Sequence, residues 1–161
     1  MRTLSHAETN TAIRAALKDA FPQTRFSVRK SSGTGYTRVS WMNGPTPASV
    51  QRLCSGFTSE RYDSLEECTQ PTGHTLTLRG EQVRPFCSGV HTDRGLTYEA
   101  VSWAMKRLGV RDLMEVLPMF TTYRAAGFEA NFYTGDFPAL RGQNAVMGWL
   151  RQVDLTGLDL T

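Results

Sequence analysis

Apolar residues recur at the three- and four-residue spacing of an amphipathic helix in several stretches of this chain. The clearest predicted helices cover residues 5–20, 46–57 and 96–108. In the first, Ser5 and Glu8 form a capping-box pattern, and Pro22 follows the last turn. One stripe of this helix is apolar and consists of Ile13, Ala16, Leu17 and Ala20.

Residues 24–30 and 36–42 instead alternate between apolar and polar positions, as strands do when one face of a sheet is buried. The glycine-containing stretch 31–35 between them predicts a hairpin turn. We expect the two flanking helices to cover the apolar face, which carries Phe26, Val28, Val39 and Trp41. A second hairpin is predicted from residues 74–80 and 83–90.

Other segments carry weaker signals. Ser64 and Glu67 form a second capping-box pattern, which predicts a short helix starting at Asp63. Residues 112–126 predict two short helices separated by Pro118. An irregular aromatic segment then leads to a last helix over about 137–152, with Asp136 as its cap.

This order of elements predicts an α+β fold. We expect an N-terminal α-β-β-α unit with an antiparallel sheet, a second hairpin, and a mostly helical C-terminal half. No repeat or linker is evident in the sequence, so we predict a single domain over residues 1–161. If the chain is subdivided, the pattern favours an α+β part over 1–92 and a helical part over 93–161.

The composition is that of an ordinary globular protein, with 40% hydrophobic and 20% charged residues in 161. It excludes a disordered chain, a collagen-like chain and a coiled coil. No apolar run has the length of a membrane span, and the first residues lack the apolar core of a signal peptide. We therefore expect a cytoplasmic protein that does not engage a membrane.

The 18 basic and 15 acidic residues give a net charge of +3, which is too small to indicate nucleic-acid binding by itself. Fifteen of the basic residues are arginines, which bind phosphates and carboxylates in bidentate fashion and stack on aromatic rings. A GC-rich genome explains this preference equally well.

The polar face of the first hairpin is the main candidate binding site, and Lys30 is expected at its rim. The other candidate residues on this face are Arg25, Arg29, Tyr36 and Arg38. Such a face can bind phosphates and stack bases, or it can anchor an acidic protein surface. Alternatively, it is simply the solvated side of an antiparallel sheet, or another part of the chain covers it.

Three further groups of residues carry weaker chemical signals. Residues 31–35 could cradle a phosphate, but they join two strands, as an ordinary hairpin turn does. Cys87, His91 and Asp93 contain the groups of a nucleophilic site, although residues at a strand end explain them as well. The acidic cluster can bind a cation or stabilise a helix N-terminus, and consists of Glu60, Asp63, Glu66 and Glu67.

The remaining residues favour a chain without metal, cofactor or catalytic residues. The three cysteines form no CxxC motif, and no HExxH motif is present. We predict that Cys54 lies in the core, and that His6 and His74 lie on the surface. The aromatic residues within 120–137 predict core packing of the C-terminal half, or an exposed interface that favours a homodimer.

Two segments of the chain resemble a known family. Residues 21–29 read FPQTRFSVR and residues 39–46 read VSWMNGPT. They resemble the FPGTKFSVR and VSWTDGPT segments of one of the large polyvalent protein-associated domains of phages and conjugative plasmids. The chain departs from that family at residues 62–65, which read YDSL where the family tends to carry FDGM.

The resemblance implies an α+β module that is encoded by mobile genetic elements. Many of the proteins that contain such modules are thought to counteract host defences. It implies no catalytic residue. We therefore expect a non-enzymatic counter-defence inhibitor that occludes a host defence complex, such as a CRISPR or restriction system. The alternatives are a nucleic-acid-binding accessory protein in phage or plasmid DNA processing, and a small enzyme that depends on a cysteine or carboxylates.

Overall fold

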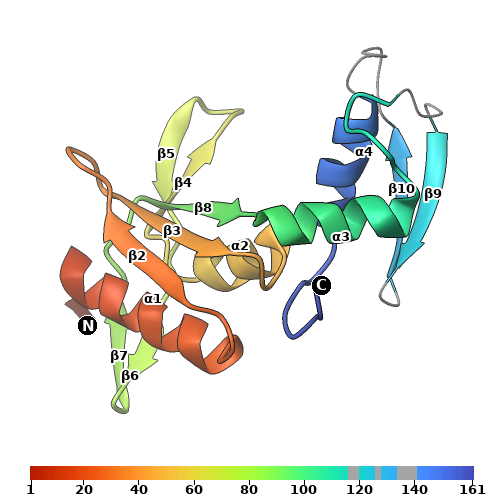
Figure 1. The fold of residues 1–161 in the computed structure, drawn as a ribbon. Helices are drawn as coiled ribbons and strands as arrows, with labels where there is room; N and C mark the ends of the chain where they lie inside the picture. Colours follow the sequence, from red (N-terminus) through yellow and green to blue (C-terminus); the bar gives the residue numbers. More distant parts are fainter. Residues whose placement is uncertain (116–119, 126–127, 134–140) are drawn as a thin grey trace. The chain divides into compact units, whose positions relative to one another are not determined.

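The computed structural model describes residues 1–115, 120–125, 128–133 and 141–161, and it combines helices and strands in an α+β fold (Figure 1). The helices are α1 (His6–Ala20), α2 (Pro47–Ser55), α3 (Tyr98–Leu108) and α4 (Arg141–Leu150). The strands are β1 (Arg2–Thr3), β2 (Phe26–Lys30), β3 (Tyr36–Met42), β4 (Glu60–Asp63), β5 (Cys68–Pro71), β6 (Leu76–Leu78), β7 (Glu81–Arg84), β8 (Gly89–Gly95), β9 (Phe120–Ala125) and β10 (Phe128–Tyr133).

The chain forms two compact units. Unit 1 comprises Met1–Trp41 and Pro47–Arg94, and unit 2 comprises Met42–Thr46 and Gly95–Thr161. The single domain predicted over residues 1–161 stays a prediction. In the ranges that the structure describes, no helix combines the length and apolar character needed to cross a bilayer.

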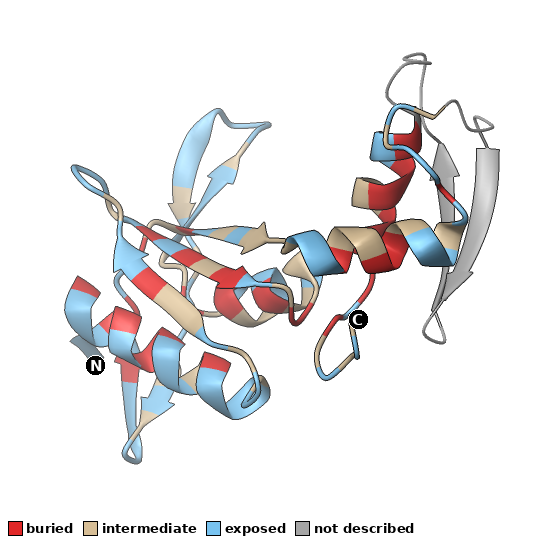
Figure 2. Cartoon of the chain, viewed as in Figure 1, coloured by how far each residue is buried: buried red, intermediate tan, exposed pale blue. Residues whose placement is uncertain are grey.

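Unit 1 is built around the three-stranded sheet β2-β3-β8. The predicted hairpin is confirmed: β2 and β3 are antiparallel, with Val28 opposite Val39 and Arg29 opposite Arg38. The predicted cover by α1 and α2 is also confirmed, since both helices contribute to the buried core beneath the sheet (Figure 2). This core includes Ile13, Leu17, Val28, Val39, Trp41, Val50, Cys54 and Phe57.

Local signals position α1 as predicted. The Ser5 hydroxyl accepts a hydrogen bond from the Glu8 amide at 3.2 Å, and the Glu8 carboxylate accepts one from the Ser5 amide at 2.7 Å. This capping box satisfies two amides that the first helical turn leaves without partners. Arg14, on the same helix, donates a 2.7 Å hydrogen bond to the Val28 carbonyl of β2.

A second, smaller sheet has the order β1-β7-β6. A hairpin around Gly80 is present as predicted, but its strands β6 and β7 are shorter than predicted, and Arg79 and Gly80 join them at φ values of 51° and 82°. Positive φ at both central residues is the geometry that suits the twist of a two-residue hairpin. Residues 89–90, predicted as the end of its second strand, begin β8 of the first sheet. The parallel pairing of β1 with β7 had no sequence signal, because β1 is only two residues long.

The predicted short helix at Asp63 is wrong. Residues 60–71 form the two-stranded hairpin β4–β5, which we call the arm. The Asp63 carboxylate accepts hydrogen bonds from the Leu65 and Glu66 amides, and Glu67 has a φ of 50°. These contacts close a tight turn. The Asp63 side chain, which could have capped a helix, therefore stabilises a reversal of the chain.

In unit 2, helices α3 and α4 pack through an apolar core in which the Trp103 and Trp149 rings stack at 5.5 Å between centroids. Helix α3 ends as predicted at Gly109, whose φ is 68°. A mostly helical C-terminal half is not confirmed, because β9 and β10 form an antiparallel hairpin where short helices and an irregular segment were predicted. Aromatic residues in both strands and two threonines in β9 favour that outcome. Pro118 and Asp136 lie outside the described residues.

A buried polar network lies between α1 and β3, and it corrects the prediction that His6 is a surface residue. The Thr37 hydroxyl donates to the Asn10 side-chain oxygen at 2.6 Å and lies 2.8 Å from His6 Nε2. Because a hydroxyl has one hydrogen, His6 Nε2 must be the donor to Thr37. The His6 Nδ1 atom is then an unprotonated acceptor, and it has no hydrogen-bond partner among the described residues.

We predict that His6 makes the stability of the protein depend on pH. Burial, with the nearby Lys30 ammonium, lowers the pKa of His6 below its usual 6.5. The unfolded chain therefore binds this proton more tightly than the folded chain, so stability is full at neutral pH and falls as the pH drops through 6.5. Urea unfolding across a pH series measures the effect.

The variant His6→Gln keeps a side-chain N–H donor for Thr37 but does not titrate. It should flatten the dependence of the unfolding free energy on pH below 6.5. The exposed His91→Gln variant is the matched control and should keep the wild-type slope. Equal slopes in wild type and His6→Gln would contradict the assignment.

Candidate functional site

The face of the β2-β3-β8 sheet opposite its core, which we call the outward face, carries most of the predicted binding residues. On β3, Thr37, Val39 and Trp41 are buried, so the side chains between them leave the sheet on the other side. On β8, Val90 belongs to the core and Thr92 bonds Gln51 of α2, which directs His91 and Asp93 outward. The outward face therefore consists of alternate residues from all three strands.

An aromatic pair crosses two strands of this face. The rings of Tyr36 and His91 stack with centroids 4.9 Å apart and planes 15° from parallel. The Tyr36 ring also covers Gly89, where an added Cβ would lie 2.5 Å from Tyr36 Cε1. Glycine at position 89 thus provides the space in which Tyr36 reaches His91, and Tyr36 remains 39% exposed.

Two arginines lie directly opposite each other beside this pair. The register places Arg29 of β2 against Arg38 of β3, and both are exposed. Like charges at opposed positions repel each other. Arg38 has a partial counterion in Asp93 at 3.8 Å, whereas neither Arg29 nor Arg25 forms an ion pair within the described residues. The outward face therefore holds positive charge that an acidic partner would neutralise.

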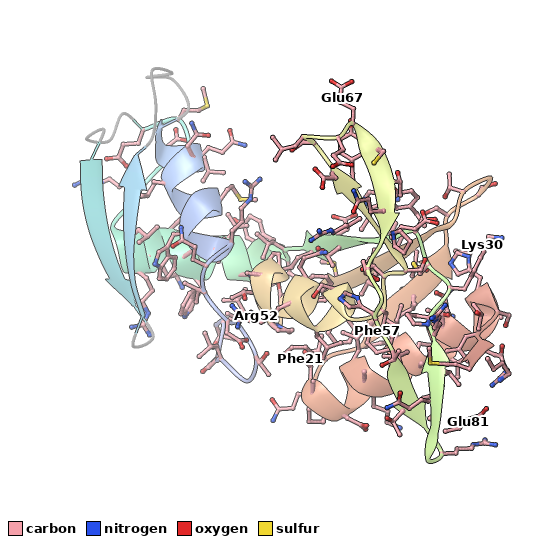
Figure 3. All side chains as sticks on the ribbon, turned by 180° about the vertical axis from the view of Figure 1, so that it is seen from behind. Phe21, Lys30, Arg52, Phe57, Glu67 and Glu81 are labelled. Atoms are coloured by element: carbon pink, nitrogen blue, oxygen red, sulfur yellow. The ribbon has the colours of Figure 1, made fainter. Side chains whose placement is uncertain are left out.

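The two other predicted binding residues lie differently. Arg25 is exposed and immediately precedes β2, in phase with Arg29. Lys30 is opposite Thr37, so its side chain leaves the sheet on the side of α1, where its charge acts on His6. The structure thus separates Lys30 from the outward face on whose rim we predicted it; Figure 3 labels its position.

Cys87, His91 and Asp93 are not brought together as a nucleophilic site would require. Cys87 is buried, with its thiol 3.0 Å from the Gly89 carbonyl oxygen and 3.5 Å from Thr37 Oγ1. His91 and Asp93 instead contact Tyr36 and Arg38 on the exposed face. Cys54 is buried as predicted, and burial raises the pKa of its thiol to about 12.

The remaining candidates also take structural positions. Residues 31–35 form the hairpin turn, closed by the Ser31 amide donating to the Tyr36 carbonyl at 2.9 Å, with Gly33 at a φ of 70°. The acidic cluster lies on the arm, and the described residues contain no group of side chains arranged to hold a metal ion. The side chains of the aromatic segment within 120–137 fall outside the described residues.

Sequence reasoning missed three contributors to the outward face. His91 and Asp93 belong to β8, a strand whose side chains alternate too weakly in polarity to reveal it. Gly89 could have been found as a glycine inside a strand, since such a residue often marks the close approach of another group.

Residues 4–98 match the family model named Large polyvalent protein associated domain 29. This chain belongs to that family. The match confirms the resemblance seen in the two N-terminal segments, and it spans α1, the β2-β3-β8 sheet and the arm. Domain 29 is associated with the polyvalent proteins of phages and plasmids. No significant match was found among curated proteins or among solved structures.

We predict that Gly89→Ala removes the aromatic pair without unfolding the protein. The new methyl group would overlap the Tyr36 ring, which is exposed enough to rotate into solvent. The unfolding free energy should change by less than about 1 kcal/mol, because alanine suits a strand better than glycine and offsets the lost contact. The NMR chemical shifts of the His91 ring protons in Gly89→Ala should resemble those in Tyr36→Ala, because in both variants the Tyr36 ring no longer stacks on His91. Wild-type His91 shifts in Gly89→Ala would contradict this account.

Proposed function

We propose that this chain is a non-enzymatic binding protein of a mobile genetic element that acts in counter-defence in the cytoplasm. In this proposal its outward face docks on an acidic patch of a host defence complex, such as a CRISPR or restriction system, and occludes it. The observation that carries the proposal is the opposed pair Arg29 and Arg38 beside the stacked rings of Tyr36 and His91.

The chemistry of this face supports a macromolecular contact. Arginine and tyrosine are the residues most enriched among interface anchors, and here they stand on strands, whose backbone is rigid. An acidic partner surface would relieve the repulsion between the two guanidinium groups. Because Tyr36 is already held by Gly89 and His91, little side-chain freedom would be lost on binding.

The distribution of negative charge favours a protein over a nucleic acid. Asp93 lies within 3.8 Å of Arg38 on the same face, and the arm of the same unit carries four more carboxylates. A phosphate backbone would be repelled by these groups, whereas a protein surface of mixed charge can complement both signs.

The double variant Arg29→Glu, Arg38→Glu should abolish counter-defence. We expect the wild-type chain to raise the efficiency of plasmid transformation or phage plating in a host with an active restriction or CRISPR system. Reversed charge at the centre of the contact should return the efficiency to that of an empty vector, because like charges then face each other across the interface.

The matched control is Arg52→Glu, Arg84→Glu, which reverses two exposed arginines on α2 and β7, and it should retain full activity. Equal amounts of folded protein are checked by immunoblot and circular dichroism. The proposal is overturned if the wild-type chain protects incoming DNA in none of the defended hosts, or if the outward-face variant protects as well as the wild type.

A nucleic-acid-binding accessory role is a second candidate, and the Tyr36–His91 pair favours it. A stacked aromatic platform flanked by arginines is what proteins use to hold single-stranded bases. This role and the first can be separated by binding to nucleic acid alone.

For the second candidate, fluorescence anisotropy with labelled single- and double-stranded DNA and RNA should show binding that weakens steeply with salt, since phosphate contacts release counterions. Arg25→Glu, Arg29→Glu, Arg38→Glu should eliminate it, and Tyr36→Ala should weaken single-strand binding selectively. Absence of binding at low salt would eliminate this role and leave the protein-binding proposal standing.

A further inference from the structure

Most residues of the arm are exposed, and only Asp63 and Gln70 of its two strands are half-buried. None of the eight residues of β4 and β5 is buried, and among the described strands β4 and β5 pair only with each other. A lone two-stranded hairpin is marginally stable in water, because it has no apolar face to pack. A hairpin of this kind that presents large apolar side chains gains stability when another surface covers it.

The base of the arm is nevertheless held firmly to unit 1. The Ser59 amide and hydroxyl both donate to the Cys87 carbonyl, at 2.7 and 3.0 Å. Across the base, the Thr72 amide donates to the Ser59 carbonyl at 3.0 Å, and its hydroxyl donates to the Thr58 carbonyl at 2.7 Å. Hydrogen bonds thus attach the base of the arm to the rest of unit 1, while its two strands project from it.

Its side chains combine negative charge with exposed apolar surface. The arm contains one basic residue, Arg61, and four acidic residues, Glu60, Asp63, Glu66 and Glu67. None of these carboxylates has an ion-pair partner among the described residues. Leu65 at the turn is 94% exposed and Tyr62 is 67% exposed. This pattern fits a surface that is basic around an aromatic patch.

The outward face of the same unit has that complementary pattern. It presents Arg25, Arg29 and Arg38 around the stacked Tyr36 and His91 rings. Figures 1 and 3 both show the arm rising from unit 1 on the side away from α1, so it projects clear of the helix that covers the core face of the sheet. Figure 3 shows Glu67 at the far end of the arm, pointing away from the sheet.

We propose that the occupant of this face, when no other partner is bound, is the arm of a second copy of this chain. Each arm lies on the outward face of the other copy, so the two contacts are equivalent and the assembly closes as a two-fold dimer. The arm carboxylates then meet Arg25 and Arg29, while Tyr62 and Leu65 cover the exposed side of the aromatic pair. Dimerisation and capture of an acidic partner compete for the same arginines.

The acidic arm and the basic outward face carry complementary charges, which favours a second copy of the chain over other occupants of the face. Both surfaces belong to unit 1, and both lack sufficient counterions in the described chain. A reciprocal contact neutralises the two of them at once. The inference does not depend on the counter-defence role, because it is tested on the purified protein alone.

Sedimentation velocity of the full chain over a concentration series tests the dimer. We expect a species of twice the 18.0 kDa chain mass at low ionic strength. It should dissociate toward monomer as the salt rises from roughly 0.05 M to roughly 0.5 M, because the ion pairs at the rim of the contact are screened.

Charge-reversal variants identify the surfaces. The arm variant Glu66→Lys, Glu67→Lys and the face variant Arg29→Glu, Arg38→Glu should each be monomeric alone. An equimolar mixture should form a heterodimer, since each contact again joins opposite charges. The matched controls Asp19→Lys, Glu81→Lys and Arg52→Glu, Arg84→Glu reverse exposed charges elsewhere and should dimerise like the wild type.

The inference is overturned by any of three results. The wild type is monomeric at every concentration at low salt; or the two variants, folded by circular dichroism, dimerise alone; or their mixture stays monomeric. A monomeric wild type that still protects incoming DNA would refute the dimer and leave the proposed function intact.

Discussion

The alternation of β2 and β3 is the constraint on which the rest of unit 1 depends. Val28 opposite Val39 fixes the register, because a shift of β2 by one residue would turn Val28 to solvent and Arg29 into the core. Burial of these valines with Trp41 against α1 and α2 therefore also sets which residues face outward. Packing of the apolar face of the hairpin thus determines which side chains are exposed on its polar face.

The same alternation explains how much could be predicted from sequence. The capping box at Ser5, the β2–β3 hairpin and the outward position of Arg29, Tyr36 and Arg38 follow from periodicity and local hydrogen bonding, and the structure has all of them. A short helix was predicted at Asp63, where the structure has the turn of the arm, because Asp63 accepts backbone amides equally well in a turn and at a helix start. Short helices and an irregular segment were predicted where the structure has the β9–β10 hairpin.

Long-range pairing accounts for what could not be predicted. His6 is buried, and the hydroxyl of Thr37, 31 residues away, accepts a hydrogen bond from its Nε2 atom. His91 and Asp93 join the outward face only because β8 pairs with β3 across the intervening arm and β6–β7 hairpin. Lys30 lies on the opposite side for a local reason, since the strand continues one residue beyond Arg29 and the alternation carries its side chain toward α1.

The net charge of +3 is a poor guide to what such a chain binds, because the charges are segregated within one unit. Carboxylates gathered on an exposed arm leave the outward face more basic than the composition suggests. A face of this kind attracts acidic surfaces from beyond contact distance, whereas its specificity depends on the shorter-range fit around Tyr36 and His91. An arm that covers the arginines in the absence of a partner would set a threshold, since only a surface that outcompetes it gains access to the rings. In the proposed scheme, two acidic surfaces would compete for one arginine pair, and the aromatic rings beside that pair would decide which of the two surfaces fits.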